Sequence, residues 1–241
     1  MTDAATQVVS LSFYRFDSFA ARVWAFTMMG FARWPMRRTP DIGFWKLCGS
    51  GTGEGFSLKP NLSVYAILAT WPDKAAAERE TARGVFARYK STAAEDWTVF
   101  LSPTSVRGDW SGAHPFIAQG HAPTGPPIGP IAALTRATVK PGMARHFWRR
   151  VPNISAVIGT DPSVLFKLGI GERPLVQQVT FSIWPDAAAM NNFTRTGPHA
   201  EAIKAVRNDG WFSEELYARF TLLSDRGTWG GTSPLDPKEL T

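Results

Sequence analysis

The sequence predicts an α+β protein in which two fused ferredoxin-like units, each ordered βαββαβ, form a β-barrel flanked by helices. The first observation is a repeat, because three signature segments occur in the same order in both halves. These are Phe-Trp-Lys-Leu at 44–47 and Leu-Phe-Lys-Leu at 165–168, Trp-Pro-Asp at 71–73 and 184–186, and Arg-Gly-Asp-Trp at 107–110 and Arg-Gly-Thr-Trp at 226–229. The second is a Pro- and Gly-rich stretch at 113–130, which predicts a linker between the copies.

Each half alternates between strand-like and helix-like hydrophobic periods. The first half predicts strands at 8–16, 43–48, 64–71 and 97–101, with one helix at 18–32 and another capped by Asp73. The second half predicts strands at 131–139, 164–169, 175–183 and 217–223, with helices at 142–150 and 186–207, the latter broken at Gly197 and Pro198. We therefore expect an N-terminal unit at 1–112, the linker at 113–130, a C-terminal unit at 131–231, and a tail at 232–241.

Composition restricts the classes of function. The chain has 241 residues, 44% of them hydrophobic, which is enough for a core without disulfides. Its single cysteine, Cys48, excludes an internal disulfide framework and a Cys-rich metal site. The net charge is +6, but no zinc-finger, RNP or P-loop pattern accompanies the basic residues, so we expect no nucleic-acid partner. No secretory signal opens the sequence, which predicts a cytoplasmic protein, at most peripheral on the inner face of the cytoplasmic membrane.

The segment 18–32 is a candidate for contact with a membrane surface. It is rich in large apolar residues and is followed by Arg33, Arg37 and Arg38. This pattern is typical of interfacial helices, which place an apolar face in the lipid and cations at the headgroups. A helix buried in the protein core has a similar composition, so both interpretations stay open.

His199 is the candidate metal ligand. When the halves are aligned on Trp-Pro-Asp, Phe86 of the first half falls on His199 of the second. Apolar residues continue a helical stripe from His199, beginning with Ala202, so we expect the imidazole to point inward toward the barrel. Imidazole is the commonest proximal ligand of haem iron, and this position predicts haem ligation. His146 is the second candidate, and a hydrogen-bonded core histidine is the alternative for either position.

Other cofactor chemistry finds less support. The glycine run at 49–55 follows a strand but does not match the dinucleotide-binding spacing, and no Gly-Lys-Ser/Thr follows it. When the halves are aligned on Phe-Trp-Lys-Leu at 44–47 and Leu-Phe-Lys-Leu at 165–168, Cys48 falls on Gly169. This predicts a position that admits only small residues, so we expect Cys48 to be a packed hydrophobe and not a haem thiolate. His114 and His121 lie in the linker, where we expect solvated side chains.

Longer segments resemble the spheroidene monooxygenase family, the acyclic carotenoid 2-ketolases. They lie at 9–22, 44–56, 65–73, 199–207 and 210–220, and the resemblance extends over nearly the whole chain. It implies a haem b enzyme that takes electrons from ferredoxin and inserts oxygen at C-2 of acyclic carotenoids. Two hydroxylations followed by loss of water would convert spheroidene to spheroidenone.

The second half also resembles the haem-binding half of dimeric α/β-barrel proteins, whose proximal histidine lies in the C-terminal unit. That resemblance is consistent with His199 as the ligand. Two alternatives remain open: a haem- or carotenoid-binding protein without turnover, and a cofactor-free monooxygenase on the same scaffold. Basic faces and barrel edges also leave a homo-oligomer open.

Overall fold

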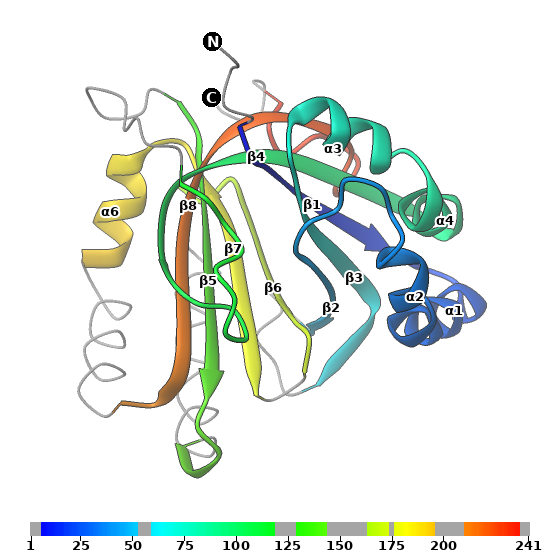
Figure 1. Ribbon diagram of the computed structural model, residues 1–241, viewed down its shortest axis with the longest axis horizontal. Coiled ribbons are helices and arrows are strands. Elements are labelled where there is room, and N and C mark those ends of the chain that lie inside the picture. Colours follow the sequence, from blue (N-terminus) through cyan, green and yellow to red (C-terminus); the bar gives the residue numbers. More distant parts are fainter. Residues whose placement is uncertain are drawn as a thin grey trace.

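A computed structural model describes residues 6–52, 59–118, 129–143, 163–173, 176–195 and 210–236. These residues form a closed antiparallel barrel in the strand order β1-β3-β2-β6-β7-β5-β8-β4 (Figure 1). The strands are β1 (Val8–Arg15), β2 (Trp45–Gly51), β3 (Pro60–Trp71), β4 (Glu95–Gly108), β5 (Ile131–Val139), β6 (Phe166–Gly171), β7 (Gln177–Trp184) and β8 (Phe212–Gly227). The predicted α+β barrel is therefore confirmed.

The helices lie outside the barrel (Figure 1). Next to the first half are α1 (Phe19–Phe31), α2 (Arg33–Met36), α3 (Lys74–Glu80) and α4 (Gly84–Thr92), and next to the second half is α6 (Ala187–Arg195). Side-chain caps begin two of them, since Ser18 accepts a hydrogen bond from the Ala21 amide and Asp73 from the Ala76 amide. A short 3-10 turn spans Pro141–Met143, and the rest of the helix predicted at 142–150 lies outside the described residues. The predicted break at Gly197 and Pro198 lies outside the described residues.

Two strand pairs join the halves into one barrel. The β4–β8 pair runs from Trp97 opposite Gly227 to Gly108 opposite Leu216, whereas the β2–β6 pair is short. The register of β4 shifts after Pro103, where proline has no amide hydrogen to donate to the ladder. Closure removes free sheet edges within the described residues.

The interior of the barrel is a packed core. Aromatic rings pack around Trp97: the Trp97 and Phe166 rings lie 4.6 Å apart and the Phe13 and Trp97 rings 5.6 Å apart, measured between centroids. Phe181 and Trp229 pack against the same group. Aromatic side chains thus pack closely in this part of the interior. The expectation that the imidazole of His199 points inward toward the barrel stays a prediction, because His199 lies outside the described residues.

The sheet register corrects the alignment of the two halves by one residue. Cys48 pairs with Ala66, and Ile170 pairs with Val179, and the two partners lie equally far before Trp71 and Trp184. Cys48 therefore corresponds to Ile170, not to Gly169, and the position does not require a small residue. Cys48 is nevertheless fully buried in the barrel core, as expected of a packed hydrophobe.

Candidate functional site

The outer faces of the two half-sheets differ at equivalent positions. In the first half, large apolar side chains on this face pack under the helices, among them Leu47, Ile67 and Phe100. The strand register places Gly169, Thr180 and Arg219 at the same positions of the second half. Similarly, Trp45, Tyr65 and Tyr14 correspond to Lys167, Gln178 and Ala137. The second half therefore carries smaller or polar groups at these six positions, whereas Tyr217 is larger than its counterpart Thr98.

We call this surface the second sheet face. It consists of the outward-pointing residues Ala133, Thr135, Ala137, Lys167, Gly169, Gln178, Thr180, Tyr217 and Arg219. Its central row runs across four strands, where Gly169 is opposite Thr180, Thr180 opposite Thr135, and Thr135 opposite Tyr217. Gly169 and Thr180 in this row are smaller than their counterparts Leu47 and Ile67 in the first half.

Helix α6 covers one end of the second sheet face. Trp184 and Phe193 pack with ring centroids 5.0 Å apart, and Met190 completes a small apolar cluster. On the polar side, Nη2 of Arg219 donates to Oδ1 of Asn191 over 3.4 Å, and the Tyr217 hydroxyl donates to Oε1 of Glu215 over 2.6 Å. Apolar and hydrogen-bonding groups therefore lie side by side at this end of the second sheet face.

The predicted ligands can be placed only in part. His199, His146 and His121 lie outside the described residues. His114 is described, and its side chain is 83% exposed with Nδ1 2.6 Å from Oδ1 of Asp109. An exposed loop imidazole of this kind does not enclose a cofactor, which agrees with the expectation of a solvated side chain. Within the described residues, no group of three His, Cys, Asp or Glu is arranged to hold a metal ion.

A buried polar cluster at one end of the barrel was not predicted. The Arg136 side chain is 1% exposed, points into the interior and pairs through Nη1 with Oε2 of Glu214. Its Nε and Nη2 have no hydrogen-bond partner in the described part of the chain. Lys46 Nζ lies 2.8 Å from Oε1 of Glu172, and the Trp110 indole donates to Oε2 of the same carboxylate over 2.6 Å. We call this group the Trp110 end.

Hydrogen bonding in the Trp110 end holds Glu214 in its charged form. Burial raises the pKa of Glu214, but the amides of Gly112 and Ser111 and the Arg136 guanidinium outweigh this effect and lower it. Those amides donate to the carboxylate over 2.8 and 3.0 Å. A sequence signal existed, because Arg136 occupies an inward position of an otherwise apolar alternating strand.

The helices in the described residues include none long and apolar enough to cross a bilayer. No protein-family model matches the chain.

Among solved structures, the chain is similar to an aldoxime dehydratase with a TM-score of 0.61. The two share 9% identity, and the match covers 90% of this chain and 82% of the other. A second aldoxime dehydratase structure, in complex with butyraldoxime, gives a TM-score of 0.60 at 10% identity, with 92% and 81% of the chains covered. Similarity at this identity shows the fold alone.

Three proteins named spheroidene monooxygenase are similar over most of their length. The protein of Rhodobacter capsulatus is 49% identical, with 97% of each chain covered. That of Cereibacter sphaeroides is 50% identical over 95% of this chain and 71% of its own. That of Rubrivivax gelatinosus is 34% identical, with 88% and 81% covered. Identity at this level over matching lengths places the chain in the spheroidene monooxygenase family.

Proposed function

We propose that the protein is a haem-dependent monooxygenase that inserts oxygen at C-2 of acyclic carotenoids. The name of its relatives supports the substrate class. The second sheet face supports the cofactor, because Gly169 and Thr180 occupy positions where the first half has the bulkier Leu47 and Ile67. Bound haem would supply activation of dioxygen for attack on a saturated C–H bond, chemistry that amino-acid side chains do not provide.

The packing of Phe86 in the first half supports a position of His199 against the outer face of the sheet. Its counterpart Phe86 is buried on α4 and packs against Trp71, with ring centroids 5.9 Å apart. Trp71 lies on the outer face of the first half-sheet. If the second half repeats this packing, His199 faces the second sheet face and not the barrel interior. We therefore propose His199 as the haem ligand on that face, with His146 as the second candidate.

Residues of the second sheet face fit a planar group with carboxylate arms. Gly169, Thr135 and Thr180 present small side chains at its centre. Lys167 and Arg219 occupy one cross-strand row with Ser182 and Ala133 between them. We propose that these two cations hold the haem b propionates by charge-assisted hydrogen bonds.

The substrate and electron source follow from the same family. We propose that two rounds of hydroxylation at C-2, each taking up one O₂, two electrons and two protons and releasing one water, form a geminal diol. Loss of water from the diol then leaves the ketone, which converts spheroidene to spheroidenone. We propose reduced ferredoxin as the electron donor and a cytoplasmic position in contact with the membrane that dissolves the substrate. A homo-oligomer remains a prediction.

The absorption spectrum of protein purified from a haem-replete host tests the cofactor. We expect a Soret band that is lost in His199→Ala and kept in the matched control His146→Ala. Loss in His146→Ala alone would reassign the ligand. Absence of the band from the parent protein would overturn the haem proposal.

Product analysis with spheroidene, dioxygen and reduced ferredoxin tests the reaction. We expect C-2 oxygenated products that form only in the presence of all three. A protein with the Soret band and no product would be a carrier. A protein that oxidises the carotenoid without the band would be a cofactor-free monooxygenase.

A further inference from the structure

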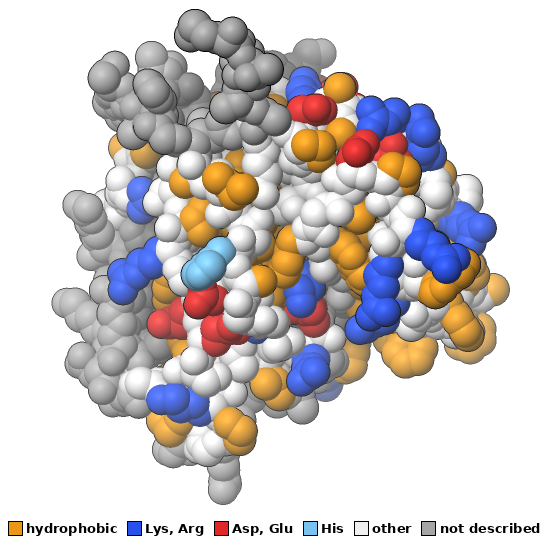
Figure 2. Space-filling view, in the orientation of Figure 1, with side chains coloured by type: hydrophobic (Ala, Val, Ile, Leu, Met, Phe, Trp, Pro, Cys, Tyr) orange, Lys and Arg blue, Asp and Glu red, His pale blue; other side chains and the backbone are white. Residues whose placement is uncertain are grey.

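Helix α1 and the following α2 expose large apolar side chains along one side. Phe19 is 83% exposed, Phe31 76%, and Phe26 and Trp34 63% each. Val23 lies between them and is also exposed. Figure 2 shows hydrophobic side chains protruding at the lower right, where Figure 1 places α1 and α2. Single exposed apolar residues are ordinary, but a continuous group of this size indicates a binding surface.

The other side of the same segment accounts for its folding. Ala25, Met28, Ala32 and Met36 are buried in the cluster between the helices and the first half-sheet. The exposed side chains are therefore additional to those that dock the segment on the barrel. The core interpretation is confirmed for one face of α1, the other face is apolar and exposed, and contact with a membrane stays a prediction.

The charge around this surface is positive. The segments α1 and α2 contain no Asp or Glu, and Arg33, Arg37 and Arg38 are exposed at their end. The Arg38 guanidinium lies 3.6 Å from the centroid of the Trp34 ring. This contact holds a cation directly beside the apolar side chains, an arrangement that suits the boundary between lipid chains and headgroups.

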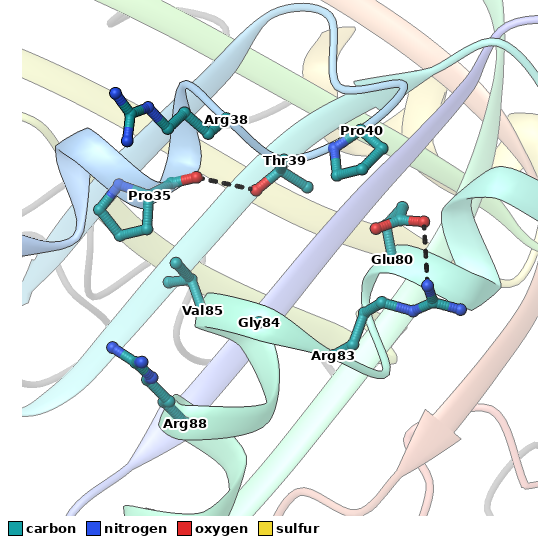
Figure 3. Close-up of a pocket in the computed structure, with 9 residues that line it drawn as sticks. All are labelled: Pro35, Arg38, Thr39, Pro40, Glu80, Arg83, Gly84, Val85 and Arg88. Carbon is teal, nitrogen blue, oxygen red and sulfur yellow. Dashed lines mark hydrogen bonds and ion pairs between the residues drawn. The ribbon is translucent and has the colours of Figure 1, made fainter.

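A groove of about 230 Å³ adjoins this surface, between the end of α2 and the start of α4 (Figure 3). Three arginines line it: Arg38, Arg83 and Arg88. Its acidic residue, Glu80, is 2% exposed and accepts a hydrogen bond from Nε of Arg79 over 2.8 Å. Nη1 of Arg83 lies 3.9 Å from the same carboxylate oxygen (Figure 3). Glu80 therefore offsets part of the positive charge of the groove, but one carboxylate does not neutralise three arginines, and Arg38 and Arg88 lie outside this ion pair.

We propose that α1 and α2 dock on an anionic phospholipid bilayer and that this groove receives a lipid headgroup phosphate. The exposed apolar side chains enter the interface, and the three arginines bind the phosphate. This inference rests on the proposed function in one respect: docking on a bilayer would bring the enzyme to a carotenoid that is dissolved in lipid. Its test measures binding without turnover, so it succeeds or fails separately from the haem proposal.

Flotation of the full chain with vesicles tests the docking. We expect the protein to float with vesicles that contain phosphatidylglycerol, and to float much less with pure phosphatidylcholine. The variant Phe26→Ser/Phe31→Ser/Trp34→Ser should lose binding to both. The variant Arg38→Gln/Arg83→Gln/Arg88→Gln should bind phosphatidylglycerol vesicles at least about tenfold more weakly, because each cation near an anionic surface adds attraction.

Matched controls lie elsewhere on the surface. Ile117→Ser/Leu223→Ser removes exposed apolar side chains, and Arg107→Gln/Lys140→Gln/Arg173→Gln removes three exposed cations. Both should float like the parent, and circular dichroism should show all variants folded. Parent protein that stays unbound, or site variants that float as well as the controls, would overturn the proposal.

Two other occupants of the groove would give different results. A groove for free phosphate predicts that inorganic phosphate raises the melting temperature of the parent but not of the arginine variant, with flotation unaffected. A docking site for an acidic electron-transfer protein predicts that the arginine variant floats normally but accepts electrons from ferredoxin more slowly. Either outcome would show that the bilayer proposal is wrong.

Discussion

Arg136 occupies in the second half of the barrel the position that Phe13 occupies in the first. Phe13 is opposite Trp97 on β4, and Arg136 is opposite Leu216 on β8. Phe13 stacks on Trp97 with an angle of 11° between the rings, whereas Arg136 pairs with Glu214. Equivalent positions of the two halves therefore line the two ends of the barrel. The interior is aromatic at the Phe13 end and polar at the Trp110 end.

The Arg136–Glu214 pair should respond unequally to removal of its partners. Glu214→Gln leaves a guanidinium buried without a counter-charge, so we expect a loss of about 3–5 kcal/mol in the free energy of unfolding. Arg136→Met should cost less, because Glu214 is 25% exposed and keeps two backbone amide donors. Urea denaturation measures both, with the double variant as control. A larger loss in Arg136→Met than in Glu214→Gln would contradict this account.

Acid should destabilise the protein through a pair of equivalent glutamates. Burial raises the pKa of Glu95, but the amides of Gly231 and Gly230 and the Arg15 guanidinium outweigh it, so the pKa is lowered, as it is for Glu214. A pKa lower in the folded state gives stability that is complete above the ordinary value of 4.5 and is lost as the pH falls through the folded value.

We therefore expect Glu95→Gln to reduce the dependence of stability on pH below about pH 4.5, measured as the urea midpoint against pH. The control is Glu78→Gln on the exposed side of α3. Equal pH dependence in the Glu95→Gln variant and the parent would contradict the prediction.

Two glycines permit the turns that carry Trp110 and Trp229. Gly108 and Gly227 have φ values of 89° and 91°, and a Cβ atom at either would clash with the carbonyl oxygen of Glu215 or Asp96. We expect Gly108→Ala and Gly227→Ala each to cost on the order of 2–4 kcal/mol, because strain and overlap add. Thermal unfolding tests this, with Gly49→Ala as control, since a Cβ atom there meets nothing within 4 Å. Equal melting temperatures would argue against it.

If haem binds as proposed, filling the second sheet face should prevent its binding without unfolding the barrel. Leu47 fits the equivalent place in the first half, so Gly169→Leu restores a side chain that this sheet geometry accommodates. We expect Gly169→Leu to keep its circular dichroism spectrum and lose the Soret band. Leu47→Ala should lose about 2–5 kcal/mol of stability and keep the band. A full haem content in the Gly169→Leu variant would show that haem does not bind on the second sheet face.

The thiol of Cys48 should be inert in the folded protein. Burial in the barrel core raises its pKa well above the ordinary value of 9.0, so the reactive thiolate is scarce. We expect no labelling by iodoacetamide near pH 8 until denaturant is added. Rapid labelling of the native protein, followed by mass spectrometry, would show that the barrel opens.

Much of the fold could be predicted from local sequence patterns. Alternation within 8–16 and 131–139, the cap at Asp73 and the repeated Trp-Pro-Asp are properties of neighbouring residues, and they predicted the order of the strands. Element ends were less predictable. The strand expected at 97–101 extends over Glu95–Gly108, because β4 pairs with a strand on each side. The helix expected after Asp73 is divided into α3 and α4 before Gly84, which has a positive φ.

By itself the sequence determined that this protein is a duplicated βαββαβ barrel of the carotenoid monooxygenase type, with His199 as its predicted ligand. Barrel closure decided which side chains meet. It brings Arg136 and Glu214 together with Lys46 and Glu172, residues far apart in the chain. Strand register decided which face each side chain occupies, since a shift of one residue moves a side chain from the interior to the outer face. Register depends on pairing between distant strands. Only the tertiary structure could therefore reveal the polar Trp110 end and the residues that make up the second sheet face.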